Sequence, residues 1–268
     1  MNRKPVLSII FISVFLILLA GCAQPKTIDA KEVITKENVQ EWDLLWISDS
    51  SGWGVVDIYA GYVAEDLGIE INVNDQWMGG LAAGEVLASL NGEPNPNLDL
   101  TRMSEYIKEA EIIVFYGNPE LSKSTDNPWD WNCGQGMEAC DVNSCDMETF
   151  DLYIEHIKEI YSIIHTLRKG QPTIIRAFDA YNPAINRRCT QHYDECLQCW
   201  ENYNKAIHMA ADEMGVPVAN VFDAWNGPDH TQDPNDKGYT WDGEHPSEKG
   251  AEVIANLVRG LGYEMVIP

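Results

Sequence analysis

The chain has 268 residues, of which 45% are hydrophobic, and its formal net charge is −24. This length suits a single α/β domain with insertions, and the hydrophobic fraction is enough to fill a core. The strong negative charge argues against nucleic acid or anionic phospholipid headgroups as partners that bind through charge, and it disfavours a polyanionic substrate.

The amino-terminal segment predicts export. Arg3 and Lys4 precede an uncharged, almost wholly apolar run over residues 6–20, shorter than the ~20 residues that a membrane-spanning helix needs. The run ends in Leu19-Ala20-Gly21-Cys22, which resembles the lipobox of bacterial lipoproteins. That resemblance implies a signal peptide over residues 1–21 and lipid on the sulfur of Cys22. The protein would then be anchored in the cell envelope, on the extracytoplasmic side of a bacterial membrane. An ordinary signal peptide or a membrane anchor is the alternative.

Residues 22–42 are polar and lack an apolar period, so we expect a lipidated tether there and one folded domain over residues 43–268. Within the domain, strand-like runs alternate with helical patterns. The expected strands cover residues 44–48, 69–73, 112–116, 173–178 and 216–222, and the expected helices cover residues 54–68, 81–90, 147–170, 193–215 and 247–262. This alternation predicts an α/β fold with a parallel sheet and helices on both faces. Active residues of such sheets lie beyond the carboxyl ends of the strands.

Small residues follow the first expected strand, where the chain must turn sharply towards a helix. Ser50 is placed at this turn, where free backbone N–H groups of a helix amino terminus can hold a developing oxyanion. A serine hydroxyl is a weak nucleophile alone and needs a base. A helix cap is the simpler interpretation of these residues taken by themselves.

The segment Trp241-Asp242-Gly243-Glu244-His245-Pro246-Ser247 supplies the missing base. Asp242 can accept a hydrogen bond from one ring nitrogen of His245 and leave the other facing Ser50. Pro246 keeps His245 out of the following helix, which Ser247 can cap.

Four blocks together resemble the SGNH, or GDSL-type, hydrolase family. Residues 48–51 (SDSS) resemble the nucleophile block, Gly80 and the following helix the second, residues 116–121 (YGNPEL) the third, and residues 242–247 (DGEHPS) the last. The family pattern has glycine at Ser48, leucine at Ser51, glycine at Tyr116 and aspartate at Pro119. The resemblance implies a three-layer α/β/α fold with a mainly parallel, flavodoxin-like central sheet.

The family's activity implies a serine esterase that needs no metal or cofactor. Ser50, His245 and Asp242 would form the triad, and the Ser50 and Gly80 N–H groups with the Asn118 side chain would form the oxyanion hole. Gly79 is the alternative donor to Gly80. The substrate would be a small-molecule or carbohydrate ester. A lipase, lysophospholipase or thioesterase with the same triad, and a non-catalytic surface-binding lipoprotein, are the alternatives.

Two cysteine-rich insertions, at about residues 121–147 and 179–199, leave the sheet at its catalytic edge. They carry six disulfide candidates: Cys133, Cys140, Cys145, Cys189, Cys196 and Cys199. Each cluster holds three cysteines, so full oxidation requires at least one bridge between the clusters, which predicts a stapled lid. Zinc bound by Cys189, His192, Cys196 and Cys199 is the rival interpretation. Trp53, Trp129 and Trp131 could stack on sugars, or bury beneath the insertion.

Overall fold

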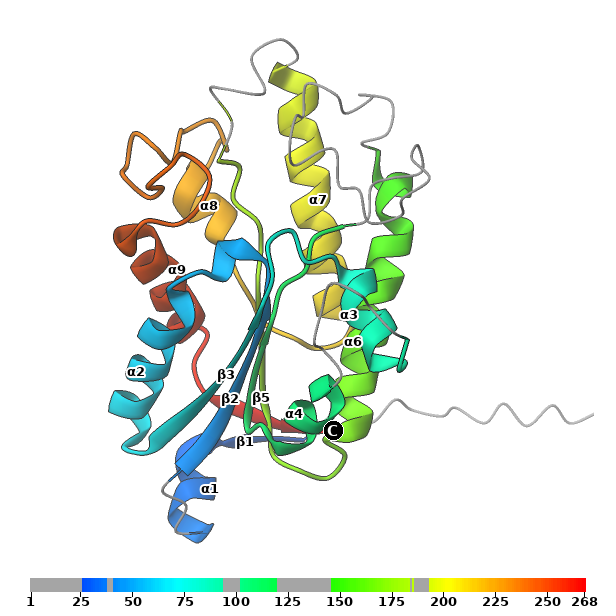
Figure 1. The fold of residues 1–268 in the computed structure, drawn as a ribbon, viewed down its shortest axis with the longest axis vertical. Helices are drawn as coiled ribbons and strands as arrows, with labels where there is room; N and C mark the ends of the chain where they lie inside the picture. Colours follow the sequence, from blue (N-terminus) through cyan, green and yellow to red (C-terminus); the bar gives the residue numbers. More distant parts are fainter. Residues whose placement is uncertain (1–25, 38–40, 94–101, 120–145, 184, 186–192) are drawn as a thin grey trace, which may run out of the picture.

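The computed structural model describes residues 26–37, 41–93, 102–119, 146–183, 185 and 193–268. A five-stranded parallel sheet lies at the centre of this part of the chain (Figure 1). Its spatial order is β3 (Glu70–Trp77), β2 (Glu41–Ser48), β4 (Ile112–Phe115), β5 (Ile174–Phe178) and β6 (Val218–Ala219). The order confirms the expected flavodoxin-like sheet, whose switch point lies between β2 and β4.

Helices cover both faces of the sheet, which confirms the three-layer α/β/α class. One layer holds α2 (Val55–Leu67), α8 (Val221–Asn226) and α9 (Glu248–Gly260), and α2 packs against α9 (Figure 1). The other layer holds α3 (Ala83–Leu90), α4 (Met103–Glu109), α6 (Asp151–Leu167) and α7 (Tyr193–Glu213), with the short 3₁₀ turn η4 (Met147–Phe150) in front of α6.

The central strands are continuous apolar runs because both of their faces are buried. Residues 44–47 of β2 and 112–114 of β4 have no accessible surface, and the residues of β5 are at most 2% exposed. Trp46 fills the middle of this core, where its ring lies 5.6 Å from that of Phe178. A rigid sheet of this kind can hold side chains at its carboxyl edge in fixed positions.

The amino-terminal part of the described chain differs from the expected tether. Residues 26–29 form β1 (Lys26–Asp29), which pairs antiparallel with β7 (Glu264–Ile267), and α1 (Ala30–Glu37) follows it. Ala30 is fully buried and Val33 is 9% exposed. The polar sequence hid this unit because its partner strand lies at the other end of the chain. Folded structure therefore begins before residue 43.

The strand expected over residues 216–222 is also shorter than predicted. Only Val218–Ala219 joins the sheet, and α8 begins at Val221. The carboxylate of Asp179 explains the change, because its Oδ1 accepts hydrogen bonds from the N–H groups of Val221 at 2.5 Å and Phe222 at 2.9 Å. The N–H groups of Val221 and Phe222 therefore donate to this carboxylate at the start of α8 and not to a neighbouring strand.

The described residues include no helix that is both long enough and apolar enough to span a bilayer. The expected signal peptide and Cys22 lie outside these residues.

Candidate active site

The candidate nucleophile Ser50 lies in a tight turn at the carboxyl end of β2. Ser50–Gly52 form a short 3₁₀ helix, η1, and α2 starts at Val55, so Ser50 stands at the amino terminus of η1 and precedes the α-helix. Asp49 caps the turn, and its Oδ1 accepts a hydrogen bond from the Ser51 N–H at 2.8 Å. Within the described residues, neither the hydroxyl nor the N–H group of Ser50 has a hydrogen-bond partner, so both can meet a ligand.

The shape of this turn depends on Gly52. A Cβ atom at position 52 would lie 2.0 Å from the Oγ of Ser48, which stands where the family has glycine. That buried Oγ accepts a hydrogen bond from Trp46 Nε1 and donates one to the Asp49 carbonyl, both at 3.0 Å. Ser48 is thus tolerated because Gly52 leaves room for its hydroxyl.

His245 lies in a loop that is fixed just before α9. Thr240 and Pro246 form an isolated antiparallel bridge, and the Trp241 N–H donates to the His245 carbonyl at 3.2 Å. Ser247 caps α9 by accepting a hydrogen bond from the Gly250 N–H at 3.1 Å, as the sequence predicted. The loop therefore presents the imidazole outside the helix.

Asp242 holds the imidazole through one ring nitrogen. Its Oδ2 lies 2.6 Å from His245 Nδ1, and its Oδ1 accepts from the backbone N–H groups of Glu244 at 2.9 Å and His245 at 2.8 Å. Burial alone would raise the pKa of Asp242, but these hydrogen bonds outweigh it and lower the pKa to about 2. Asp242 is therefore ionised at neutral pH. Among the described residues, Nε2 of His245 has no hydrogen-bond partner.

The nucleophile turn and the histidine loop meet at the same edge of the sheet. The Trp53 ring, three residues after Ser50, lies with its centroid 6.1 Å from that of His245. Burial raises the pKa of Asp49, and the charge of His245 is among the interactions that oppose this shift. Ser50 and His245 share no hydrogen bond in the described part of the chain. Catalytic hydrogen bonds are often formed only when substrate is bound.

Asn118 and Gly80, the other expected oxyanion-hole residues, lie on adjoining segments. The Asn118 N–H donates to the Leu81 carbonyl at 2.8 Å, and Asn118 and Ala82 form a parallel bridge. The Asn118 Nδ2 donates to Asp49 Oδ2 at 2.8 Å, which links it to the Ser50 turn. Gly79 and Gly80 are both exposed, and Gly80 has a φ of 70° that favours glycine.

Sequence reasoning missed a set of tyrosine hydroxyls behind Asn118. The hydroxyl of Tyr116 donates to Asn118 Oδ1 at 3.2 Å and lies 2.8 Å from the hydroxyl of Tyr203 on α7. Burial raises the pKa of both tyrosines, so both hydroxyls stay protonated. Tyr116 was noted only as a departure from the family pattern. Nothing near it in the sequence indicates its contact with Tyr203.

Three exposed tryptophans lie in a chain of ring contacts that includes His245: Trp53, Trp77 at the end of β3, and Trp241. Trp53 lies 5.9 Å from Trp77 and 6.1 Å from Trp241, and the Trp241 ring lies 6.2 Å from His245. Of the tryptophans singled out from sequence, Trp53 is thus at the site. Trp129 and Trp131 lie outside the described residues. Trp77 and Trp241 were missed, although Trp241 directly precedes Asp242.

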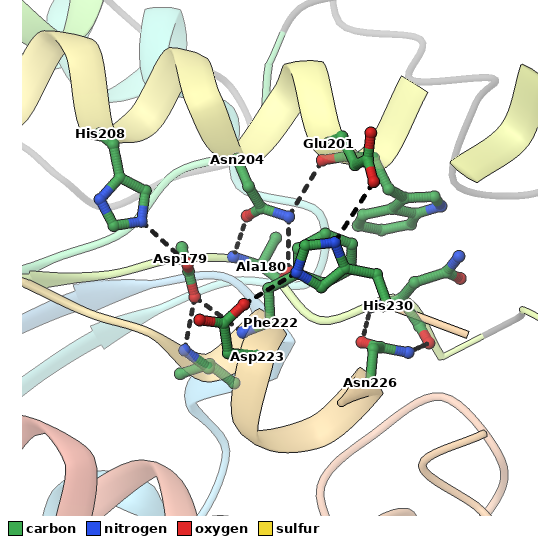
Figure 2. A network of polar contacts seen from close by, with 12 residues as sticks. Asp179, Ala180, Glu201, Asn204, His208, Phe222, Asp223, Asn226 and His230 are labelled. Carbon is green, nitrogen blue, oxygen red and sulfur yellow. Dashed lines mark hydrogen bonds and ion pairs between the residues drawn. The ribbon is translucent and has the colours of Figure 1, made fainter. Parts of the chain in front are cut away.

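A second group of histidines and acids lies beyond β5 and β6, as Figure 2 shows. His208 Nε2 lies 3.0 Å from Asp179 Oδ2, and His230 Nε2 lies 2.8 Å from Asp223 Oδ1. Asn204 on α7 bonds both backbone groups of Ala180, at 2.7 and 2.9 Å. Because these bonds mainly join α7, α8 and the end of β5, the group serves to hold helices together.

Two of the six disulfide candidates can be described. Cys196 and Cys199 are buried in α7, and each takes part in a disulfide bond. Cys133, Cys140, Cys145 and Cys189 lie outside the described residues, as does His192, so bridging between the clusters stays a prediction. No group of three or more His, Cys, Asp or Glu side chains in the described part of the chain is arranged to hold a metal ion.

Comparison with known proteins decides the family. The sequence profile of the GDSL-like lipase/acylhydrolases matches residues 34–258, which span most of the chain. This chain belongs to the GDSL-like lipase/acylhydrolase family. The protein is therefore a hydrolase that acts on ester bonds, and its substrates are small-molecule esters.

Solved structures of this family share the fold. A lipase from a goat rumen metagenome is 20% identical with a TM-score of 0.57, and the match covers 83% of this chain and 98% of that one. An acetyl xylan esterase from Geobacillus stearothermophilus is 14% identical with a TM-score of 0.52, covering 84% and 97%. A GDSL-like lipase from Bacteroides thetaiotaomicron is 14% identical with a TM-score of 0.51, covering 87% and 96%. No protein of curated function matches the chain.

Proposed function

We propose that this GDSL-like hydrolase is a serine esterase whose triad is Ser50, His245 and Asp242. The observation that carries the proposal is the 2.6 Å contact between Asp242 and His245 Nδ1, which leaves Nε2 available at the edge where Ser50 lies. An aspartate in this position fixes the tautomer of the ring and stabilises the imidazolium formed during the reaction.

In the reaction, Nε2 of His245 takes the proton of the Ser50 hydroxyl as Oγ bonds to the ester carbonyl carbon. The imidazolium then gives this proton to the leaving alcohol oxygen as the carbon–oxygen bond breaks. Water repeats the sequence on the acyl-enzyme and releases the acid. Because the pKa of Asp242 is about 2, the aspartate stays ionised throughout the pH range of ordinary esterase assays.

The oxyanion is stabilised by the N–H groups of Ser50 and Gly80 and by the second Nδ2 hydrogen of Asn118. The first Nδ2 hydrogen is held by Asp49, while the second has only a long contact of 3.4 Å to the Leu81 carbonyl. Asp49 and Tyr116 therefore hold the Asn118 amide by its two ends, which orients it for the carbonyl oxygen. Orientation of this kind makes electrostatic stabilisation effective.

The protein acts at the cell envelope, where lipid on Cys22 anchors it outside a bacterial cytoplasmic membrane. This part of the proposal is supported by the sequence at residues 3–22 alone. The substrate is a carbohydrate O-acyl ester. Long-chain acyl esters and thioesters are the alternatives, and rates on p-nitrophenyl acetate and p-nitrophenyl laurate separate short-chain from long-chain preference.

The direct test replaces Ser50 by alanine. We expect hydrolysis of p-nitrophenyl acetate to fall by ~10⁴-fold or more, while the circular dichroism spectrum and melting temperature stay those of the wild type. Ser51→Ala is the matched control: it removes a hydroxyl one residue away that donates to Asp49 Oδ1, and because the Ser51 N–H still holds this carboxylate, the rate should change only a few-fold. Full activity in the Ser50→Ala protein would assign the nucleophile to another residue.

A further inference from the structure

The tryptophans of the described chain divide sharply by exposure. Trp42, Trp46, Trp200 and Trp225 are at most 6% exposed, as expected for large apolar rings in a core. Trp53, Trp77 and Trp241 are 49%, 45% and 62% exposed. All three exposed indoles belong to one contact group, which reaches His245 through Trp53 and Trp241. Exposed apolar side chains gathered in one place indicate a binding surface.

The three indoles come from different parts of the fold and meet through their rings. Trp53 is parallel to Trp77, with an angle of 10° between the planes, and perpendicular to Trp241, with an angle of 89°. Trp241 also lies over the imidazole of His245 at an angle of 24°. The group therefore presents indole faces and edges in two directions beside the proposed catalytic base.

Two carboxylates lie close in sequence to the indole pair. Asp75 lies two residues before Trp77 and thus on the same side of β3, and Asp57 lies in the first turn of α2, four residues after Trp53. Partial desolvation, and to a smaller extent the negative charge of Asp57, raise the pKa of Asp75 to about 6. Carboxylates accept hydrogen bonds from hydroxyl groups.

The combination of indole rings and carboxylates favours a sugar over an acyl chain. The apolar C–H face of a pyranose packs on an indole, and its ring hydroxyls can donate to carboxylates. A channel for an acyl chain is lined mainly with aliphatic side chains, whereas the ring contacts at His245 are made by exposed indoles. The acidic pair and the net charge of −24 also disfavour anionic lipids and sulfated glycans.

We propose that Trp53, Trp77 and Trp241 form a sugar-binding subsite, which stacks on a pyranose ring of a neutral carbohydrate and presents its O-acyl group to Ser50. This inference rests on the proposed esterase function and names the residues that would bind the sugar of its substrate. The subsite acts in binding, so it should raise the affinity for glycan esters without being required for the chemistry of the acyl transfer.

The test compares a sugar ester and a simple ester in the same protein. For Trp77→Ala and Trp241→Ala we measure kcat/KM on acetylated xylotriose and on p-nitrophenyl acetate, and expect the ratio of the two to fall roughly 10-fold, the range of one aromatic stacking contact. Leu152→Ala is the matched control, because Leu152 is 54% exposed on α6 outside the indole group, and its ratio should equal that of the wild type.

Binding measured without turnover separates this inference from the proposed function. In Ser50→Ala protein, calorimetry should give a Kd for xylohexaose that rises roughly 10-fold when Trp77→Ala is added. Persistent esterase activity of Ser50→Ala together with this rise would overturn the triad and keep the subsite. Unchanged ratios and an unchanged Kd would overturn the subsite and keep the esterase. A selective loss on p-nitrophenyl laurate would assign the indoles to the acyl chain and overturn the proposal.

Discussion

Two of the carboxylate–histidine pairs in the described part of the chain have similar distances and differ in their surroundings. In one, Asp242 holds His245 Nδ1 at 2.6 Å, and both side chains are nearly 30% exposed. In the other, Asp179 holds His208 Nε2 at 3.0 Å, and the Asp179 side chain is only 4% exposed. The two aspartates differ most in what else they bind.

The remaining hydrogen bonds of each aspartate show what each pair is for. Within the part of the chain that the structure describes, Asp242 bonds only to its own loop, at Glu244 and His245, so it orients one imidazole. Asp179 caps α8 while holding α7 through His208, so it joins two helices to the end of β5 (Figure 2). A histidine–aspartate contact alone therefore does not identify a catalytic site. The free ring nitrogen and its neighbours do.

Replacing each histidine in turn gives the largest expected effect. His245→Ala removes the proposed base, so we expect kcat on p-nitrophenyl acetate to fall by ~10⁴-fold. His208→Ala leaves the reacting groups in place and should keep the rate of the folded protein within about 3-fold of wild type. Steady-state kinetics on proteins of equal folded fraction measure both. Equal losses in the two variants would remove the distinction drawn between the pairs.

A smaller effect is expected behind Asn118, where a network supports the exposed site. Tyr116→Phe removes the hydrogen bond to Asn118 Oδ1 but keeps the buried ring. We expect kcat to fall about 10-fold with little change in KM. A poorly oriented Asn118 amide stabilises the oxyanion of the transition state less well, but it contributes little to binding of the substrate. Tyr203→Phe should reproduce part of this loss. A rise in KM at constant kcat would contradict a positioning role.

The smallest effect concerns stability and pH at the buried pair. The hydrogen bond to Asp179 raises the pKa of His208, with further contributions from the charges of Asp179, Asp212 and Asp223. Since the folded pKa lies above the unfolded value, the stabilisation is fully present below ~pH 6.5 and is lost as pH rises through the folded pKa.

The free energy of unfolding of wild type minus that of His208→Gln should therefore be larger near ~pH 5.5 than near ~pH 9. The change in this value between the two pH values should stay below about 1 kcal/mol, because the His208 side chain is partly exposed. Urea denaturation at the two pH values measures it. A difference that grows with pH would contradict the assigned direction of the shift.

The sequence predicted the elements whose signals are local. The first four expected strands and the five expected helices are present in the structure, because an apolar run or a helical pattern within each segment marks it. The contact of Asp242 with His245 follows from a spacing of three residues. The predictions were wrong for residues 26–37, expected to be part of a tether, and for the length of the strand expected over residues 216–222. The structure of both segments depends on residues far away in the sequence. β1 needs β7 at the other end of the chain, and the start of α8 needs Asp179, 42 residues earlier.

The same division applies to the candidate site. Ser50, Asn118 and His245 follow strand ends or precede a helix, so their placement at one edge could be predicted from topology. The Tyr116–Tyr203 contact joins residues 87 apart in sequence, and the indole group joins three separate elements. Such contacts are set by packing, and no short spacing in the sequence encodes them.

The central claim is that the Ser50 hydroxyl is the nucleophile activated by His245. Labelling with a fluorophosphonate, followed by peptide mass spectrometry, tests it most directly. The account predicts one adduct, on Ser50, that forms in the wild type and in His208→Ala but is lost in His245→Ala. An adduct on another residue, or a folded wild-type protein that takes no label, would contradict it.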